Sequence, residues 1–154
     1  MRIIKLHNIS ARLYQKGYRT LASLISAYIT RCYRCVIYPQ THLGGGTIFG
    51  YGGIGVVIHK DTWIGDNVTI AQNVTIASKD GGAPRIGDNT YIGANSVIIG
   101  NISIGKNVFI GALSLVNKDV PDNAICYGIP SKVIRFRSEE ELAVFKEWSE
   151  RQRK

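Results

Sequence analysis

The chain has 154 residues, 45% of them hydrophobic, and a formal net charge of +8 at neutral pH. This length and apolar content suit one folded domain and exclude a disordered or fibrous chain. The positive charge is concentrated at the start, because residues 1–35 contain seven Lys or Arg and no acidic residue.

Residues 1–35 are predicted to form a helical cap. Apolar residues recur there at the i, i+3, i+4, i+7, i+8 spacing of an amphipathic helix, at Leu21, Leu24, Ile25, Tyr28 and Ile29. A shorter series, Leu6, Ile9 and Leu13, precedes Gly17. Two helices packed on the end of the next segment would cover its open strand edge. His7 is expected at the surface of this cap.

The first segment also bears on localisation. Its longest nearly apolar stretch, 21–29, is too short to span a bilayer, and nothing in the segment predicts a signal peptide. Cys32 and Cys35 form a CxxC pair without a second pair for zinc, so these thiols and Cys126 are expected to be reduced. We expect a cytoplasmic protein. The basic leader suits either a solvated cap or peripheral contact with the inner face of the membrane, and no nucleic-acid partner is expected.

From residue 36 onward the apolar residues keep a spacing of six. Nine isoleucines follow it in two series, Ile58, Ile64, Ile70 and Ile76, then Ile86, Ile92, Ile98, Ile104 and Ile110. Six is a multiple of the strand period and does not fit a helix, so each isoleucine is predicted to point inward from a short strand. Gly and turn formers follow several of them, as in Gly65-Asp66-Asn67. Strands and corners repeated without helices predict a solenoid running to about Val116.

Two irregularities interrupt or end the repeat. Ile76 and Ile86 are ten residues apart, so four extra residues must bulge from a corner within 77–85, where repeat proteins tend to mount function. Beyond the repeat, Ser138-Glu139-Glu140-Glu141 is a capping-box sequence that predicts a last helix. The expected organisation is a cap at 1–35, a solenoid domain at 36–137 and a C-terminal helix at 138–154.

The repeat units and the segment Gly128-Ile129-Pro130-Ser131-Lys132-Val133-Ile134-Arg135 resemble the hexapeptide-repeat acyltransferases. Gly-Ile-Gly-Val-Val-Ile-His at 53–59 and the coil at 72–76 are most similar to serine acetyltransferases and related sugar or capsule O-acetyltransferases. The resemblance covers about 36–136. It implies a mainly β fold, a left-handed parallel β-helix with N-terminal helices and a C-terminal helix.

The resemblance further implies a homotrimer with acetyl-CoA in a groove between neighbouring solenoids. The pantetheine arm needs small residues beside the main chain, and the matching positions are Ala77, Ser78, Gly93, Ala94, Gly111 and Ala112. Cations near the last coil, Lys118, Lys132 and Arg135, suit the phosphates of the nucleotide. Corner packing and solvation are the competing roles for these residues. No metal is expected.

Acetyl transfer from a thioester to a hydroxyl needs a base that takes the hydroxyl proton, and His is the usual one. Of His7, His42 and His59, only His59 follows a ladder isoleucine in mid-repeat, where other units carry Gly. A large ring at such a position is predicted to have a function, so His59 is the candidate catalytic base. Tyr51, Lys60, Asp61 and Trp63 are the candidate acceptor-side residues.

The acceptor stays open between L-serine and a sugar of a surface polysaccharide or its precursor. The Asp-His pair of the serine enzymes should fall within Gly50-Tyr51-Gly52, and their second His near Ala83, but this chain has none of these residues there. A scaffold that keeps the fold without the chemistry is the alternative. A hydratase of the γ-carbonic anhydrase type would need more histidines than the three present.

Overall fold

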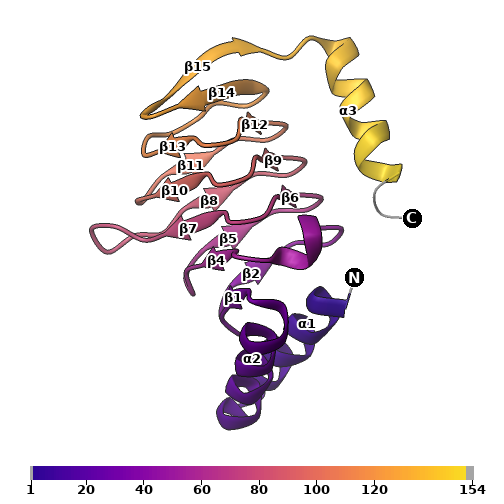
Figure 1. Ribbon diagram of the computed structural model, residues 1–154, viewed down its shortest axis with the longest axis vertical. Coiled ribbons are helices and arrows are strands. Elements are labelled where there is room, and N and C mark those ends of the chain that lie inside the picture. Colours follow the sequence, from indigo (N-terminus) through magenta and orange to yellow (C-terminus); the bar gives the residue numbers. More distant parts are fainter. Residues whose placement is uncertain (1, 152–154) are drawn as a thin grey trace.

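The computed structural model describes residues 2–151 and shows a three-sided stack of short parallel strands with helices at both ends of the chain (Figure 1). Residue 1 of the predicted cap and 152–154 of the predicted last helix lie outside the described residues. Within 2–151 no helix is both long enough and apolar enough to cross a bilayer.

Each coil contributes one strand to each of three faces. Sheet A contains β1 (Val36–Ile37), β4 (Val57–Ile58), β7 (Thr75–Ala77), β10 (Val97–Ile99) and β13 (Leu115–Val116). Sheet B contains β2 (His42–Leu43), β5 (Trp63–Ile64), β8 (Arg85–Ile86) and β11 (Ser103–Ile104). Sheet C contains β3 (Ile48–Phe49), β6 (Thr69–Ile70), β9 (Tyr91–Ile92), β12 (Phe109–Ile110), β14 (Ala124–Gly128) and the antiparallel β15 (Ser131–Phe136). The predicted β-solenoid is confirmed.

The spacing of six places the isoleucines in the core. Ile58, Ile76 and Ile98 stack in register on sheet A, and the other ladder isoleucines do the same on sheets B and C. All nine are buried. The residue two before each ladder position also points inward where it is small or β-branched, as at Val56 and Thr90. Each coil therefore fills its own interior, and stacking removes the rest of the apolar surface from water.

Three corners join the sheets and run the length of the stack as edges. The AB edge comprises 38–41, 59–62, 78–84 and 100–102, and the BC edge 44–47, 65–68, 87–90 and 105–108. The CA edge comprises 50–56, 71–74, 93–96 and 111–114. Asn takes the positive-φ corner position on the BC and CA edges, where amide side chains bond between coils, as from Asn73 to Asn95 (3.1 Å).

The solenoid extends beyond Val116, where the spacing predicted its end. Val120 pairs with Ile104, and Cys126 pairs with Ile110 on β14. Val120, Ala124 and Cys126 are buried. This last partial coil is shorter than the others, so its inward residues fall out of the six-residue spacing although they fill the same interior.

Helices α1 (Arg2–Gln15) and α2 (Arg19–Tyr33) cap the first coil, as predicted. Ile3 and Ile29 join the core cluster beside Ile37. The outward face of α2 carries Leu21, Leu24 and Tyr28, which are exposed, whereas Ala22 and Ile29 are buried. One expectation for the cap is wrong. His7 is buried and not on the surface.

Helix α3 (Glu139–Arg151) begins with the predicted capping box. The Ser138 N–H donates to Glu141 Oε2 (3.0 Å), and the Glu141 N–H donates to Ser138 Oγ (3.2 Å). The helix returns along sheet C, where the Trp148 ring meets Tyr91 edge-on with centroids 6.0 Å apart. The expectation that α3 packs on a solenoid face is confirmed.

Candidate active site

The predicted catalytic residues gather where the AB edge passes the second coil. The corner between β4 and β5 contains His59, Lys60 and Asp61, and Trp63 begins strand β5 of sheet B. The His59 N–H donates to the Ile76 carbonyl of the next coil (2.9 Å), and its carbonyl accepts from Thr41 Oγ1 (3.3 Å). The backbone of His59 is therefore held from both neighbouring coils, while 31% of its side chain stays exposed.

The contacts of the His59 ring determine which nitrogen carries a proton. Nδ1 accepts from the Asp61 N–H at 3.3 Å, so the neutral ring in this arrangement holds its proton on Nε2. Asp61 Oδ2 lies 3.8 Å from Nδ1, beyond hydrogen-bond distance. Asp61 is nevertheless the residue placed to orient the ring, since a small movement would let its carboxylate accept from Nδ1–H and free Nε2 as a base.

The corner insertion is a small ordered hairpin on the next coil of the same edge. The Lys79 N–H donates to the Gly82 carbonyl (3.0 Å) and the Gly82 N–H to the Lys79 carbonyl (3.2 Å). Asp80 and Gly81 form the turn with positive φ, as two-residue hairpins require. Because β7 pairs with β4, the hairpin emerges one coil from His59. The predicted corner bulge is confirmed, and it lies beside the candidate base.

The other two histidines are placed differently. His42 lies on β2 in register with Trp63, and the two rings stack with centroids 5.1 Å apart. His7 is enclosed, and its Nε2–H donates to the Thr41 carbonyl (3.1 Å). Burial is the largest influence on His7 and lowers its pKa, against the smaller opposing effect of that hydrogen bond. His59 is thus the histidine that is exposed and has no aromatic stacking partner among the described residues.

Contrary to the prediction from the sequence, the size of the His59 ring is not evidence of a function. The glycines used for comparison, Gly65, Gly93, Gly105 and Gly111, lie on the BC and CA edges and not on the AB edge. They are small because a Cβ there would lie only 2.3 to 2.8 Å from the next coil. The residues in register with His59 are Ala77, at the end of β7, and, one coil further, Ile99, at the end of β10. A ring at this corner meets no such restriction, so its size alone indicates no function.

The predicted cofactor positions are divided between two edges. Ala77 and Ser78 lie on the AB edge beside the hairpin, whereas Gly93, Ala94, Gly111 and Ala112 lie on the CA edge. A Cβ at Gly93 would lie 2.5 Å from the Ala112 nitrogen, and one at Gly111 would lie 2.8 Å from the Tyr127 Cβ. Coil packing therefore explains both glycines. Ala112 is exposed, and Ala77, Ser78, Ala94 and Gly111 are partly exposed.

Tyr51 also lies on the CA edge and not with His59. It lies within a one-turn 3-10 segment, Gly50–Gly53, where the first coil has three residues more than the coil above it. Its φ of 48° is in the left-handed region and its side chain is 84% exposed. Tyr51 therefore protrudes from the CA edge, on the side of sheet A opposite to His59.

Leu113 is a residue that the sequence interpretation missed. It occupies the corner position that Asn73 and Asn95 hold on the neighbouring coils, with a φ of 56°. Leu pays a steric penalty in this conformation that Asn largely avoids, and its side chain is 64% exposed. This corner therefore presents a strained, solvent-facing Leu beside Ala112. Its signal in the sequence is the Leu that interrupts the Asn positions.

The three predicted phosphate-binding cations differ in their availability. Lys118 and Lys132 are exposed. Arg135 forms a bidentate pair with Glu141, with distances of 2.7 and 2.6 Å. Hydrogen bonding to Arg135 is the main cause that lowers the pKa of Glu141 to about 2. The Arg135 fork therefore serves to hold the start of α3.

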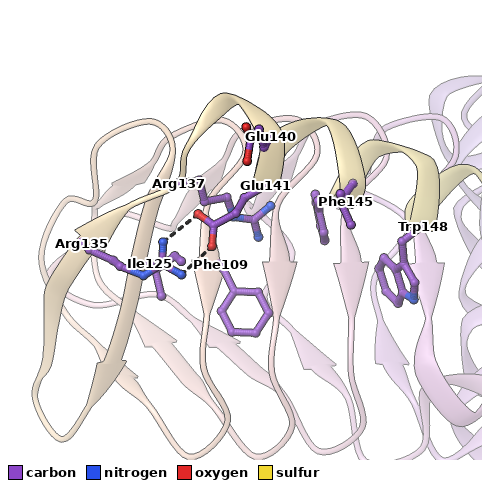
Figure 2. Close-up of a pocket in the computed structure, with 9 residues that line it drawn as sticks. Phe109, Ile125, Arg135, Arg137, Glu140, Glu141, Phe145 and Trp148 are labelled. Atoms are coloured by element: carbon purple, nitrogen blue, oxygen red, sulfur yellow. Dashed lines mark hydrogen bonds and ion pairs between the residues drawn. The ribbon is translucent and has the colours of Figure 1, made fainter.

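A hollow lies elsewhere, between α3 and sheet C (Figure 2). It has a volume of about 680 Å³ and is lined largely by apolar and aromatic side chains, including Phe109, Phe145 and Trp148. Arg137 stacks over Phe145, 4.0 Å from the ring centroid. The hollow contains neither His59 nor any predicted cofactor residue except Arg135. The candidate site residues lie on the AB and CA edges of the solenoid, so they are not part of this hollow.

Among residues 2–151, no three His, Cys, Asp or Glu side chains gather as a metal site would require. Cys35 and Cys126 are buried free thiols, and burial raises their pKa values to about 12 and about 11. The AB edge brings together an imidazole, a neighbouring carboxylate and a structured loop.

Comparisons with known proteins agree with the β-solenoid fold. Residues 83–118 match the bacterial transferase hexapeptide family (six repeats). Serine acetyltransferase 2 of Arabidopsis thaliana is 34% identical over 142 residues, which is 90% of this chain and 44% of that protein. The solved serine acetyltransferase of Brucella abortus in complex with coenzyme A is 29% identical with a TM-score of 0.84, covering 88% of this chain and 55% of that one.

The soybean serine acetyltransferase complexed with serine is 33% identical with a TM-score of 0.82, covering 86% of this chain and 56% of that chain. This chain spans about half the length of the relatives that it matches.

Proposed function

The chain carries the hexapeptide repeat of bacterial transferases and matches serine acetyltransferases over most of its own length, and on this basis we propose that it is an acetyl-CoA-dependent O-acetyltransferase. It transfers the acetyl group to a hydroxyl of a small acceptor. The observation that carries this proposal is the placement of His59, Asp61 and the hairpin at 79–82 on one edge of a fold whose relatives are acetyltransferases.

The CA edge is the proposed place for the pantetheine arm of acetyl-CoA. Ala94 and Ala112 are small and at least partly exposed residues on successive coils, and the exposed Leu113 would add an apolar contact beside them. Lys118 and Lys132 supply charge for the phosphates toward the last coil. The relative from Brucella abortus was solved with coenzyme A, which supports the same ligand here.

His59 is the proposed general base. Nε2 takes the proton of the acceptor hydroxyl as its oxygen attacks the thioester carbonyl, the C–S bond breaks, and the imidazolium returns the proton to the leaving thiolate. This role needs a free Nε2, so Asp61 must accept from Nδ1–H. We propose that binding of substrate closes the 3.8 Å gap between Asp61 Oδ2 and Nδ1 and selects that tautomer.

A homotrimer would join the two edges. Outward side chains of sheet A are mostly apolar, namely Val36, Val57, Thr75, Val97 and Leu115. Sheet A lies between the AB and CA edges, so a second copy packed along it comes close to both. In a closed ring of three copies, the CA edge of one protomer would face the AB edge of the next and form one cleft.

L-serine and a sugar hydroxyl are the two acceptor candidates. The relatives that match over most of this chain are serine acetyltransferases, and one of them was solved with serine, which favours L-serine. The residues Gly50, Tyr51, Gly52 and Ala83, at positions where the serine enzymes are expected to carry Asp and His, favour another hydroxyl.

The test is thiol release from acetyl-CoA with L-serine and with a panel of nucleotide sugars and free sugars. Calorimetric titration with CoA measures cofactor binding separately. Turnover with one acceptor class supports the proposal and names the class. CoA binding without turnover above buffer hydrolysis for any hydroxyl acceptor contradicts the enzyme and leaves the scaffold. Absence of CoA binding contradicts the whole proposal.

A further inference from the structure

Helix α1 presents a basic stripe on the side away from the core. Its cations recur at helical spacing on one face, at Arg2, Lys5 and Arg12, and Lys16 continues the series directly after the helix; all four are exposed. The opposite face is buried through Ile3, His7 and Ser10. The helix is therefore amphipathic in an unusual sense, because its outer face is cationic with no acidic residue to pair with it.

Helix α2 presents an apolar stripe on its own outer side. Leu21, Leu24 and Tyr28 follow the i, i+3, i+7 spacing and are exposed, Leu24 by 62%. They lie across the helix from the buried Ala22 and Ile29. Nothing among the described residues covers this stripe, so three large side chains face solvent next to one another.

The two stripes belong to one surface. Helices α1 and α2 pack side by side, with Ser10 Oγ of α1 donating to the Ala22 carbonyl of α2 (2.8 Å) and lying 3.2 Å from Ser26 Oγ. Arg19 stacks over Tyr14, 5.8 Å from its centroid, where the hairpin turns. The first acidic residue in the chain is Asp61, so the whole cap is free of carboxylates. Figure 1 shows α1 and α2 projecting together from the end of the solenoid.

We propose that the outer surface of α1 and α2 binds an anionic lipid bilayer, with the apolar stripe entering the interface and the basic stripe lying on the headgroups. A bilayer offers both requirements at once, since its apolar region accepts Leu and Tyr and its anionic headgroups attract Lys and Arg. A second copy meeting this surface symmetrically would oppose cations to cations, which disfavours it. This proposal is independent of the acetyltransferase activity.

The experiment is sedimentation of the full chain with vesicles of phosphatidylcholine alone or with about a third phosphatidylserine, at low and high salt. We expect binding to the anionic vesicles that weakens with salt, and little binding to the neutral ones. Lys5→Gln with Arg12→Gln and Lys16→Gln should weaken partitioning on the order of 100-fold. Leu21→Ser with Leu24→Ser and Tyr28→Ser should abolish it.

Matched controls alter the same residue types elsewhere. Lys79→Gln with Arg85→Gln and Lys146→Gln removes three exposed cations outside the cap, and Val144→Ser removes an exposed apolar side chain; both should bind as the unaltered chain does. Equal effects of control and stripe variants contradict the proposal, as does absence of vesicle binding. A different outcome is that the protein does not bind vesicles, but its molecular mass rises with protein concentration and is lower in the α2 variant. This result would identify a second copy of the chain as the occupant instead. Because all altered side chains are exposed, circular dichroism should show unchanged folding.

Discussion

His59 and Asp61 form a pair whose usefulness depends on which hydrogen bond Nδ1 makes. In the present arrangement the Asp61 N–H donates to Nδ1, and the carboxylate stays 3.8 Å away. An imidazole held in this tautomer offers a donor at Nε2 and not a base. The carboxylate contact would reverse this, so the catalytic role assigned to His59 makes a specific demand on Asp61.

His59→Gln should lower kcat by roughly 10²- to 10⁴-fold while leaving CoA affinity unchanged, because Gln keeps the polarity of the corner but cannot take a proton. Asp61→Asn should lower kcat on the order of 10²-fold, since an amide cannot hold the Nδ1–H tautomer in the same way. Steady-state kinetics with acetyl-CoA and calorimetry with CoA measure the two effects. His42→Gln is the control, and a kcat that survives His59→Gln rejects the base.

His7 should make folding sensitive to mild acid. Its Nε2–H donates to Thr41, and its buried Nδ1 would become an unsatisfied N–H if protonated. The folded-state pKa is lowered below its ordinary value of 6.5, chiefly by burial, so the unfolded chain binds more protons in this range. Stability should therefore fall as the pH drops below about 6.5 toward the folded-state pKa.

Thermal unfolding between about pH 7.5 and pH 5 checks the role of His7. The fall in Tm toward acid should be reduced in His7→Gln, which can still donate to the Thr41 carbonyl. His42→Gln should change the profile much less, because the charge of His42 is the smallest of the three causes that shift the pKa of His7. Parallel profiles for the unaltered chain and His7→Gln would contradict the assignment.

Leu113→Asn should stabilise the fold and weaken cofactor binding. Asn tolerates the positive φ that costs Leu about 1 kcal/mol, and it can extend the amide row of Asn73 and Asn95. For a chain of this length the Tm should rise by about 2 to 4 °C. Scanning calorimetry measures the first effect and the KM for acetyl-CoA the second. An unchanged KM would separate Leu113 from the cofactor.

At the scale of elements, the hairpin at 79–82 is an addition to a regular coil. Strands β4 and β7 are offset by 18 residues, whereas β7 and β10 are offset by 22. Removing Lys79, Asp80, Gly81 and Gly82 restores the regular spacing, so the solenoid should still fold. We expect circular dichroism and Tm close to those of the intact chain, with a loss of turnover. Full activity after deletion would mean that the hairpin is not part of the site.

Much of the fold follows from local spacing, and the site follows from it only in part. Isoleucine at every sixth residue predicts inward side chains because one strand and one corner occupy six residues. The sequence does not show which corners stack on the same edge of the solenoid. Gly65 and Gly93 follow ladder isoleucines as His59 does, but they lie on other edges. Helical spacing also does not indicate that Leu24 faces solvent while Ile25 packs against the core, because both residues fit the same series. These assignments depend on packing between distant segments.

At the scale of the whole molecule, the proposed homotrimer depends on the outer face of sheet A, which lies between the AB and CA edges. Val57→Asp with Leu115→Asp places charges on its outer face and should convert a trimer into monomers that fold but do not turn over acetyl-CoA. Light scattering after gel filtration gives the mass. Val144→Asp on α3 is the control, and a trimer that persists with charges on sheet A would assign the contact to another face.

The regular stacking of coils also sets a height. Each coil adds about 4.8 Å along the stack, and the cap lies at one end while His59 lies in the second coil and Ala112 in the fourth. If the cap binds a bilayer, the number of coils between the cap and the reacting atoms sets the distance of these atoms from the membrane. An extra coil of 18 residues placed ahead of β4 would raise them by one step without altering their geometry. Turnover of a lipid-anchored acceptor would then change, and that of a freely diffusing one would not.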